Sequence, residues 1–359
     1  MSNRSEFKQP VKQALAKRVG NACSFPSCNS VTEGPNLESE IGISRTGMAC
    51  HIYAAATGPA ARRVDVNMPV EKLTDISNGI WMCYTHGKLI DTDESTYTVE
   101  QLMVWKDVAE IRAMLWQQFG RNIELLPKHF NRVPLPKSKI EFESLGQENH
   151  LIGEAISNSC IEQIWGKEES LAIRDALIEV VRNAFEHGNA GNICIEITEN
   201  SIKVSDDGSS YDAKMLLEEA RQGGGFHAIH EITSRFSDAI YFTSSNENKI
   251  NCHVFSVVSS SENIKSLTPC HIEISKDYYW EREVDFKVAE CCKVVYVIFP
   301  KYFALSDALK IPVLVNNHLP KGKELIFVAE NLSSRAVDLM TQELNGLGLS
   351  DTKIINFNH

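Results

Sequence analysis

Hydrophobic and polar positions divide the chain into three segments with different periodicities. In the first segment, short strand-like stretches alternate with loops until apolar residues begin to recur every three or four positions. Thr98 and Gln101 precede this run in the spacing of a capping box, and Gly120 follows it. The pattern predicts one long helix that closes the segment. Its apolar positions are Leu102, Trp105, Val108, Ile111, Leu115 and Phe119.

Pro134 and Pro136 interrupt helix and strand patterns alike, so we interpret residues 131–139 as a linker between residues 1–130 and residues 140–261. An amphipathic helix is expected at 171–188. The strands expected in this second segment are 192–198, 202–206, 239–245 and 251–259.

The third segment, residues 262–359, alternates between strand and helix patterns, with a helix expected at 333–345. The strands expected here are 294–299, 312–316, 324–330 and 352–357. Cys291 and Cys292 precede the first of these strands, and we interpret them as buried strand residues. Together the three segments predict an α+β fold.

Composition narrows the class of protein. Apolar residues make up 43% and charged residues 23%, which is ordinary for a globular protein. The sequence contains no run of roughly 18 consecutive apolar residues, the length that a membrane-spanning helix needs. The polar, basic N-terminus does not resemble a secretory signal. Ten cysteines are too few for a disulfide scaffold of this length. We therefore expect a cytoplasmic protein whose clustered cysteines bind metal.

Two closely spaced pairs of residues suggest a zinc site. Cys23 and Cys28 form the first pair, and Cys83 and His86 form the second. Each pair can present two ligands from one tight turn, and four such ligands suit a single tetrahedral zinc ion. The sequence therefore predicts a structural zinc that holds the loop-rich first segment together.

The residues around these pairs resemble the HNH, or His-Me-finger, nucleases over about residues 10–118. The matching pieces are Cys23 and Cys28, His51-Ile52, Asn78 to Cys83, His86 and Lys88 to Asp91. The resemblance implies a zinc-pinned strand–strand–helix unit that hydrolyses phosphodiesters with Mg²⁺ or Mn²⁺. It implies that His51 is the base that deprotonates water and that Asn78 orients it.

The chain departs from this family at two positions. Cys50 stands where many members have a metal-binding Asp or His, and Gly87 stands where many have a histidine. Asp91, one helical turn further on, could supply an oxygen ligand to the catalytic metal. Two alternatives stay open: His86 could be catalytic instead of binding zinc, and the module could hold nucleic acid or a partner without cutting. Arg62-Arg63 could contact phosphates.

A second constellation begins on the helix expected at 171–188. Glu179 and Asn183 lie one turn apart on its polar face, where an asparagine lowers helix propensity. Asp206 and Gly208 follow a strand, and a glycine-rich turn comes later in the chain. The glycines of that turn are Gly223, Gly224 and Gly225.

This order resembles the GHKL ATPases, which include gyrase-type topoisomerases, chaperones and histidine kinases, over about residues 145–260. The resemblance implies that Asn183 holds Mg²⁺, that Glu179 polarises the attacking water and that Asp206 accepts from the adenine amino group. Gly208 would let the base approach, and the glycine turn would cover the phosphates with backbone N–H groups. The threonine-containing strand motif of the family is not evident in residues 251–258.

The two resemblances together imply an ATP-regulated nuclease that cuts nucleic acid, DNA rather than RNA, in defence against phage. Residues 1–140 carry 17 basic against 14 acidic residues, whereas the remainder carries 19 against 33, so only the first part could attract phosphates. Two rivals stay open: a kinase of the histidine- or serine-kinase branch, and a non-catalytic sensor or scaffold. Residues 262–359 are expected to dock a partner protein or a second copy.

Overall fold

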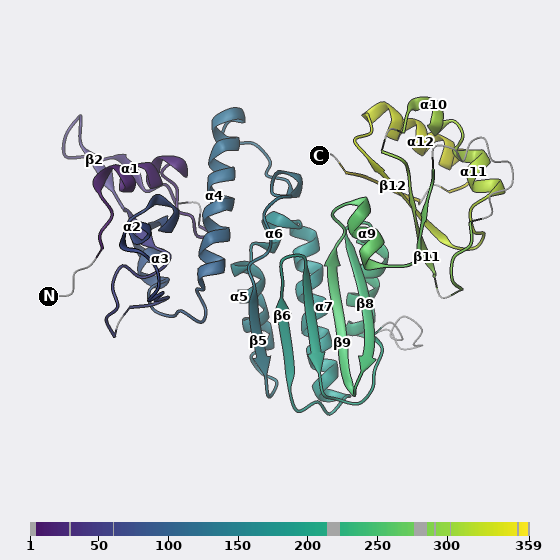
Figure 1. Cartoon of the computed structure of the whole chain (residues 1–359), viewed down its shortest axis with the longest axis horizontal. Coiled ribbons are helices and arrows are strands. Elements are labelled where there is room, and N and C mark those ends of the chain that lie inside the picture. Colours follow the sequence, from purple (N-terminus) through teal and green to yellow (C-terminus); the bar gives the residue numbers. More distant parts are fainter. Residues whose placement is uncertain are drawn as a thin grey trace. The chain divides into compact units, whose positions relative to one another are not determined.

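The computed structural model describes residues 5–28, 30–59, 61–213, 223–275, 286–290, 292–301, 303–349 and 352–357. These residues form both helices and strands (Figure 1). The described strands make two two-stranded sheets, one four-stranded sheet and one five-stranded sheet. It divides into two compact units, Met1–Ala228 with Ser244–His253 and Ile229–Thr243 with Val254–His359. A mixed α and β protein is therefore confirmed.

A strand–strand–helix arrangement forms the centre of the first part of unit 1. Strands β3 (Gly47–His51) and β4 (Gly79–Cys83) pair antiparallel, and helix α3 (Tyr84–Leu89) follows directly. Helix α1 (Gln9–Arg18) packs on both strands. The smaller elements are β1 (Glu33–Pro35), β2 (Ile43–Arg45), α2 (Val70–Leu73) and η1 (Ile76–Asn78).

Helix α4 (Val99–Phe119) is the long helix that the periodicity predicted. The capping box of Thr98 and Gln101 is present, and Gly120 ends the helix with φ of 85°. Trp105 is fully buried on its inner face, and its indole N–H donates to the carbonyl oxygen of Asn158 at 2.6 Å. Asn158 is the last residue of α5 (Glu148–Asn158), so this bond joins the first part of unit 1 to the helices that follow.

A five-stranded sheet in the order β5-β6-β7-β9-β8 follows, with α7 (Lys167–Glu186) along one face (Figure 1). Buried and half-buried positions alternate along β6 (Ile193–Ile197) and β7 (Ser201–Asp206), as expected for strands with one covered face. Strand β5 (Ser138–Phe142) begins within the segment 131–139, so the last two residues of the predicted linker are extended. The shorter helices here are η2 (Pro127–His129) and α6 (Ile161–Ile164).

Strands β8 (Ile240–Glu247) and β9 (Ile250–Val257) are joined by a two-residue turn. Both turn residues, Asn248 and Lys249, have positive φ, at 53° and 66°. This is the conformation of a type I′ hairpin turn, which matches the twist of the two strands. Helix α8 (Gly224–His230) and the π-helical turn η4 (Glu231–Arg235) precede the hairpin.

Unit 2 contains a parallel sheet of β10 (His271–Glu273), β11 (Val294–Ile298), β12 (Glu324–Glu330) and β13 (Lys353–Phe357). The helices of this unit are α9 (Ser261–Leu267), α10 (Leu305–Ala308), α11 (Ile311–Asn317) and α12 (Ser334–Gly346). The strand expected at 312–316 is wrong, because these residues form α11. Pro312 fits the first turn of a helix, and Ile311 and Leu314 are buried at helical spacing.

The cysteines of unit 2 differ from the sequence interpretation. Cys292 is buried, as expected, but it lies before β11 and forms a disulfide bond with Cys270. Cys291 lies outside the described residues. The pairing was missed because Cys270 and Cys292 are 22 positions apart, and nothing in their local patterns relates them.

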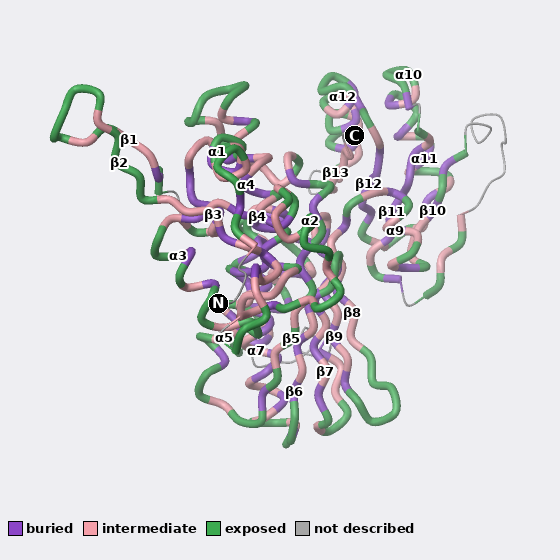
Figure 2. The backbone as a smooth tube through the Cα atoms, turned by 60° about the vertical axis from the view of Figure 1, so that its left-hand side comes forward, coloured by how far each residue is buried: buried purple, intermediate pink, exposed green. Residues whose placement is uncertain are grey.

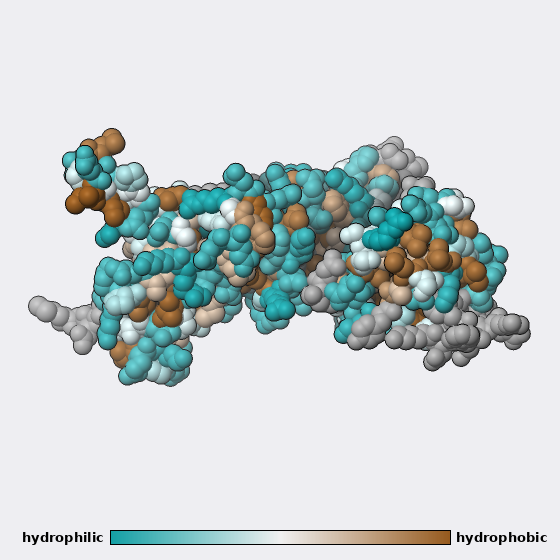
Figure 3. Space-filling model, turned by 90° about the horizontal axis from the view of Figure 1, so that it is seen from above, coloured by the Kyte–Doolittle hydropathy of each residue, from teal (hydrophilic) through white to brown (hydrophobic). Residues whose placement is uncertain are grey.

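Several large apolar side chains are exposed, and some of them lie close together. Leu37 and Ile41 lie on the hairpin between β1 and β2, whose tip is exposed in Figure 2. Leu309 and Val313 are exposed around α11. Figure 3 shows that hydrophobic residues, in brown, lie in groups among the hydrophilic ones on the face that it presents. Among the described residues, no helix combines the length and the apolar character that a membrane span requires.

We expect Trp105→Phe to lower the free energy of unfolding by about 1–3 kcal/mol, because it leaves the carbonyl of Asn158 without its donor while keeping an aromatic ring. Thermal or urea denaturation measures the change. Trp116→Phe is the control, since Trp116 lies half-buried on the same helix beneath the guanidinium groups of Arg112 and Arg121. Equal losses in the two variants would contradict a special role for the Trp105 bond.

Candidate functional site

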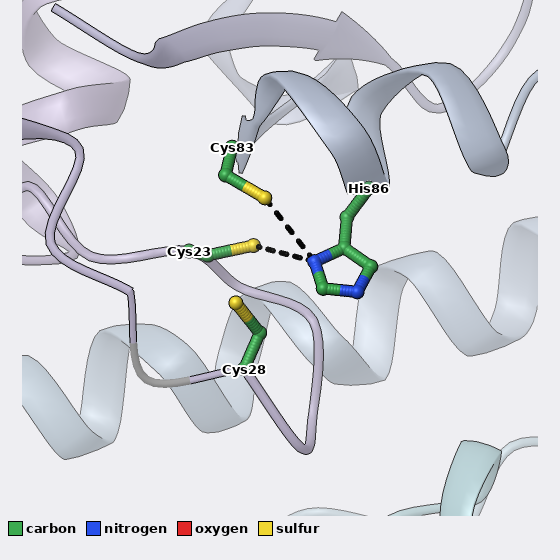
Figure 4. A group of neighbouring side chains, drawn as sticks. All are labelled: Cys23, Cys28, Cys83 and His86. Carbon is green, nitrogen blue, oxygen red and sulfur yellow. Dashed lines mark hydrogen bonds between the residues drawn. The ribbon is translucent and has the colours of Figure 1, made fainter.

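The four predicted zinc ligands lie together in the structure. The ligand atoms of Cys23, Cys28, Cys83 and His86 are all within 4.8 Å of one another (Figure 4). His86 turns Nδ1 toward the sulfur atoms, at 3.2 Å from Cys83 and 3.7 Å from Cys23. Three thiols and one imidazole form a ligand set for tetrahedral zinc. The cluster could therefore hold a zinc ion.

Local structure explains why these side chains converge. Cys83 ends β4 and caps α3, so His86 lies within the first turn of that helix. Phe25, between the two cysteines of the first pair, stacks on the His86 ring with 4.0 Å between centroids. The edge of Phe25 also meets Trp105 at 4.9 Å. The cluster is thus attached to the core of α4 through one aromatic ring.

Protonation of the cluster depends on its burial. Burial raises the pKa of the Cys23 thiol to about 12, and it lowers the pKa of His86. A neutral imidazole is already the form that binds metal, whereas the thiol of Cys23 has to lose its proton when zinc binds. The guanidinium of Arg112, which donates to the Cys23 carbonyl at 2.8 Å, adds positive charge nearby.

Two of the predicted nuclease residues, His51 and Asp91, line a cavity of about 380 Å³. His51 ends β3, and its ring stacks on Phe7 with 3.9 Å between centroids. Asn78, which the sequence predicted to orient His51, is buried. Its side chain accepts from Tyr53 N–H at 2.7 Å and donates to the carbonyls of Tyr53 and Leu73. It therefore fixes the backbone that follows His51 and not the imidazole itself.

Arg63 differs from its neighbour Arg62. Its side chain is only 3% exposed, and it donates to the carbonyls of Ile52 and Ile90 and to Asp91 at 3.0 Å. The suggestion that Arg63 contacts phosphates is therefore wrong. Arg62 lines the cavity, and its Nε is buried without a hydrogen-bond partner among the described residues.

The two departures from the nuclease pattern lie against each other. A Cβ added to Gly87 would come within 2.9 Å of Cys50 Sγ and 2.7 Å of Met48 Sδ. Cys50 is buried, and burial raises the pKa of its thiol far above its usual range. A neutral thiol is a poor ligand for a hard cation. Asp91 is the oxygen ligand that the sequence predicted. Its side chain is 58% exposed and forms an ion pair with Arg63.

Most residues of the predicted nucleotide site line another cavity, of about 680 Å³. Glu179 and Asn183 come from α7, Asp206 from the end of β7, and Gly223, Gly224 and Gly225 from the start of α8. Residues 214–222, which precede these glycines, lie outside the described residues. Gly208 does not line the cavity. A Cβ there would meet the Gly188 carbonyl at 2.9 Å, so the turn requires glycine.

Two adjacent aspartates have different surroundings. Asp206 is buried, and its Oδ1 accepts from Gly208 N–H and from Asn251 Nδ2 at 2.8 Å. Asp207 points away and accepts from the backbone N–H groups of Gly191 and Asn192, which lower its pKa together with the Asn192 side chain. Only Asp206 can therefore bind a ligand in the cavity.

At the opposite side of this cavity, Glu179 forms an ion pair with Arg182 at 3.3 Å. Arg182 also reaches Glu148 and Asn149 of α5. A Cβ on Gly224 would lie 2.6 Å from Glu179 Oε2, so this glycine allows the turn to approach the carboxylate. The backbone of the glycine turn and the Glu179 carboxylate are consequently close neighbours.

Sequence reasoning missed two residues of this cavity. Asn251 and His253 occupy alternate positions of β9, both are fully or almost fully buried, and both line the cavity beside Asp206. The pattern offered a clue, because polar residues recurred at positions where β9 should turn apolar side chains inward.

Comparisons with known proteins add no family: no protein-family model matches the chain, and no curated protein sequence matches it.

We expect the purified protein to contain about one zinc per chain, because the four ligands form one tetrahedral site. Cys28→Ser should lose the metal and lower the melting temperature. Cys194→Ser, which changes a half-buried free thiol on β6, should keep it. Elemental analysis by mass spectrometry measures the metal. Unchanged zinc in Cys28→Ser would exclude Cys28 as a ligand.

Proposed function

We propose that this chain is an ATP-binding protein in which a GHKL-type nucleotide pocket regulates an HNH-like nuclease module. One observation carries the proposal: a single cavity is lined by Glu179, Asn183, Asp206 and the glycine turn, residues that are far apart in the sequence. Asn183 would hold Mg²⁺ at the phosphates, Asp206 would accept from the adenine amino group, and Glu179 would orient water for hydrolysis.

The nuclease part of the proposal concerns the cavity beside His51. Its imidazole would take the proton of the attacking water, and Asp91 would offer an oxygen ligand to Mg²⁺ or Mn²⁺. Arg62 supports this assignment, because its buried Nε needs an acceptor and a phosphate oxygen would supply one. The cation stabilises negative charge on the phosphate when it is bound.

A continuous chain of contacts within unit 1 would connect the nucleotide cavity with the zinc cluster of the nuclease module. From the zinc ligand His86 it runs through Phe25 to Trp105, and from there to Asn158 at the end of α5. At the other end of α5, Glu148 and Asn149 hold Arg182, which also pairs with Glu179. A shift of α7 on nucleotide binding would therefore reach the zinc cluster through packed groups. Restraint of cleavage by ATP suits a cell in which ATP is abundant and foreign DNA is rare.

A second candidate function is nucleic-acid sensing without cleavage. The contact between Gly87 and the buried Cys50 favours it, because this pair fills the space where the nuclease family places two metal ligands. In this candidate, His51 and Arg62 would bind a phosphate and the ATP pocket would report the event.

For the nucleotide pocket, we expect ATP with Mg²⁺ to raise the melting temperature, because ligand binding stabilises the native state. Asn183→Ala and Asp206→Ala should each remove most of this shift. Glu179→Ala should keep the shift and lose phosphate release. Differential scanning fluorimetry and a phosphate-release assay provide the two measurements.

The matched control is Asp207→Ala. The carboxylate of Asp207 lies one position from Asp206 and accepts from Gly191 N–H, Asn192 N–H and Asn192 Nδ2. Because these partners lie outside the cavity lining, Asp207→Ala should keep the ATP-induced shift. If Asp206→Ala and Asp207→Ala respond to ATP alike, the proposed pocket is misplaced.

For the nuclease module, we expect His51→Ala to reduce plasmid cleavage by about 100- to 10,000-fold in Mg²⁺ or Mn²⁺, as for loss of a general base. His150→Ala, which changes an exposed histidine on α5, is the control. ATP should slow wild-type cleavage by about 5- to 150-fold, the range of ordinary allosteric coupling, and Asn183→Ala should abolish this effect.

Three results would change the assignment. Equal cleavage by wild type and His51→Ala excludes His51 as the base. Cleavage that is indifferent to ATP excludes the proposed regulation. DNA binding that depends on Arg62 without any cleavage would establish the sensing function instead.

A further inference from the structure

His253 has an unsatisfied hydrogen-bonding group inside the nucleotide cavity. His253 is 0% exposed, and its Nε2 has no hydrogen-bond partner among the described residues. The nearest acceptor, Asp206 Oδ2, lies 3.8 Å away, beyond hydrogen-bond distance. A buried polar nitrogen of this kind is destabilising unless something binds it, and the cavity in front of it is where a ligand would lie.

The neighbours of His253 determine which of its nitrogens carries the hydrogen. Ser244 Oγ lies 2.9 Å from His253 Nδ1, and it already accepts a hydrogen bond from Ala213 N–H at 2.9 Å. The serine hydroxyl hydrogen can be donated to Nδ1. We assign the ring hydrogen to Nε2, because there it faces the carboxylate oxygen Oδ2 of Asp206 while Nδ1 accepts from Ser244. Burial lowers the pKa of His253, and Asp206 opposes this only in part, so the ring is neutral.

Asp206 presents the complementary group. Its Oδ1 is occupied by Gly208 and Asn251, whereas its Oδ2 accepts no hydrogen bond from the described residues. The cavity thus contains an acceptor, Oδ2, beside a donor, Nε2–H, separated by 3.8 Å. A ligand edge with a donor next to an acceptor matches this pair.

We propose that His253 reads the base of the nucleotide together with Asp206. Asp206 Oδ2 accepts from the adenine 6-amino group, and His253 Nε2–H donates to a ring nitrogen beside that amino group. This inference rests on the proposed binding of ATP and names the group that selects adenine. A 6-oxo purine presents an oxygen acceptor to Asp206 Oδ2, so this contact becomes repulsive on either edge of the base. On the N1 edge its ring N–H also opposes the N–H of His253. The pocket therefore takes adenine nucleotides and rejects inosine and guanine nucleotides.

Adenine has an acceptor nitrogen on either side of its amino group, N1 on one edge and N7 on the other. Calorimetry with Mg²⁺ can show which of these two nitrogens meets His253. It compares the binding of ATP, 1-deaza-ATP and 7-deaza-ATP to the wild-type protein. One deaza analogue should bind about 10- to 100-fold more weakly than ATP, since it leaves the buried N–H of His253 unpaired, and the other should bind like ATP. If both bind as tightly as ATP, the inference is overturned without any variant.

His253→Leu keeps the bulk of the side chain and removes the donor, so ATP and the penalised analogue should bind this variant equally. His253→Gln places an amide donor near the position of Nε2 and should restore the difference. Ser244→Ala provides a milder test, because loss of the hydroxyl lets the ring hydrogen move to Nδ1 and should reduce the difference. A full difference between ATP and the analogue in His253→Leu would contradict the assignment.

The inference and the proposed function fail in different ways. A wild-type protein that binds neither ATP nor either analogue has no adenine nucleotide site, and both fall. A wild-type protein that binds ATP through Asp206 with no deaza penalty keeps the proposed function, and only the role of His253 is wrong.

Discussion

The arrangement of unit 1 depends on one buried indole. Trp105 lies where the aromatic ring behind the zinc cluster meets the helices that carry the nucleotide cavity, and its N–H satisfies a helix-terminal carbonyl. Helix ends leave such carbonyls without partners, and a buried one needs a donor from elsewhere. The fully buried indole therefore contacts both the turn that carries the Cys/His cluster and the end of α5. It attaches the small module around the cluster to the larger sheet-and-helix core.

The two candidate sites differ in how polar groups are arranged. In the nucleotide cavity, Asn251 uses its amide to hold Asp206 and the Ser209 carbonyl, which leaves one carboxylate oxygen directed at the cavity. Beside His51, the carboxylate of Asp91 faces a buried arginine, and the neighbouring thiol is protonated. The first site is prepared for a neutral, hydrogen-bonding ligand edge. The second contains the buried, unpartnered Nε of Arg62 as a donor beside the half-exposed carboxylate of Asp91.

Local patterns were sufficient where a feature depends on neighbours in the sequence. The cap and end of α4, the strands β6 and β12 and the pairing of Cys83 with His86 all follow from spacing. Long-range relations were not accessible. The disulfide between Cys270 and Cys292, the burial of Arg63 and the grouping of His253 with Asp206 depend on which elements become neighbours in space. The helix α11 was mistaken for a strand because its β-branched content outweighed its proline.

The turn between β8 and β9 has a consequence beyond the hairpin. Counting back from Asn248 and Lys249 places Ser244 opposite His253, which is the contact in which Nδ1 accepts from the serine hydroxyl. Side chains alternate along a strand, so one inserted or deleted residue at this turn would move His253 to the other face of the sheet. Loops usually tolerate length changes, yet the length of this one sets which residue lies against His253. A change of turn length could therefore remove the contact between Ser244 and His253 without altering any residue that lines the cavity.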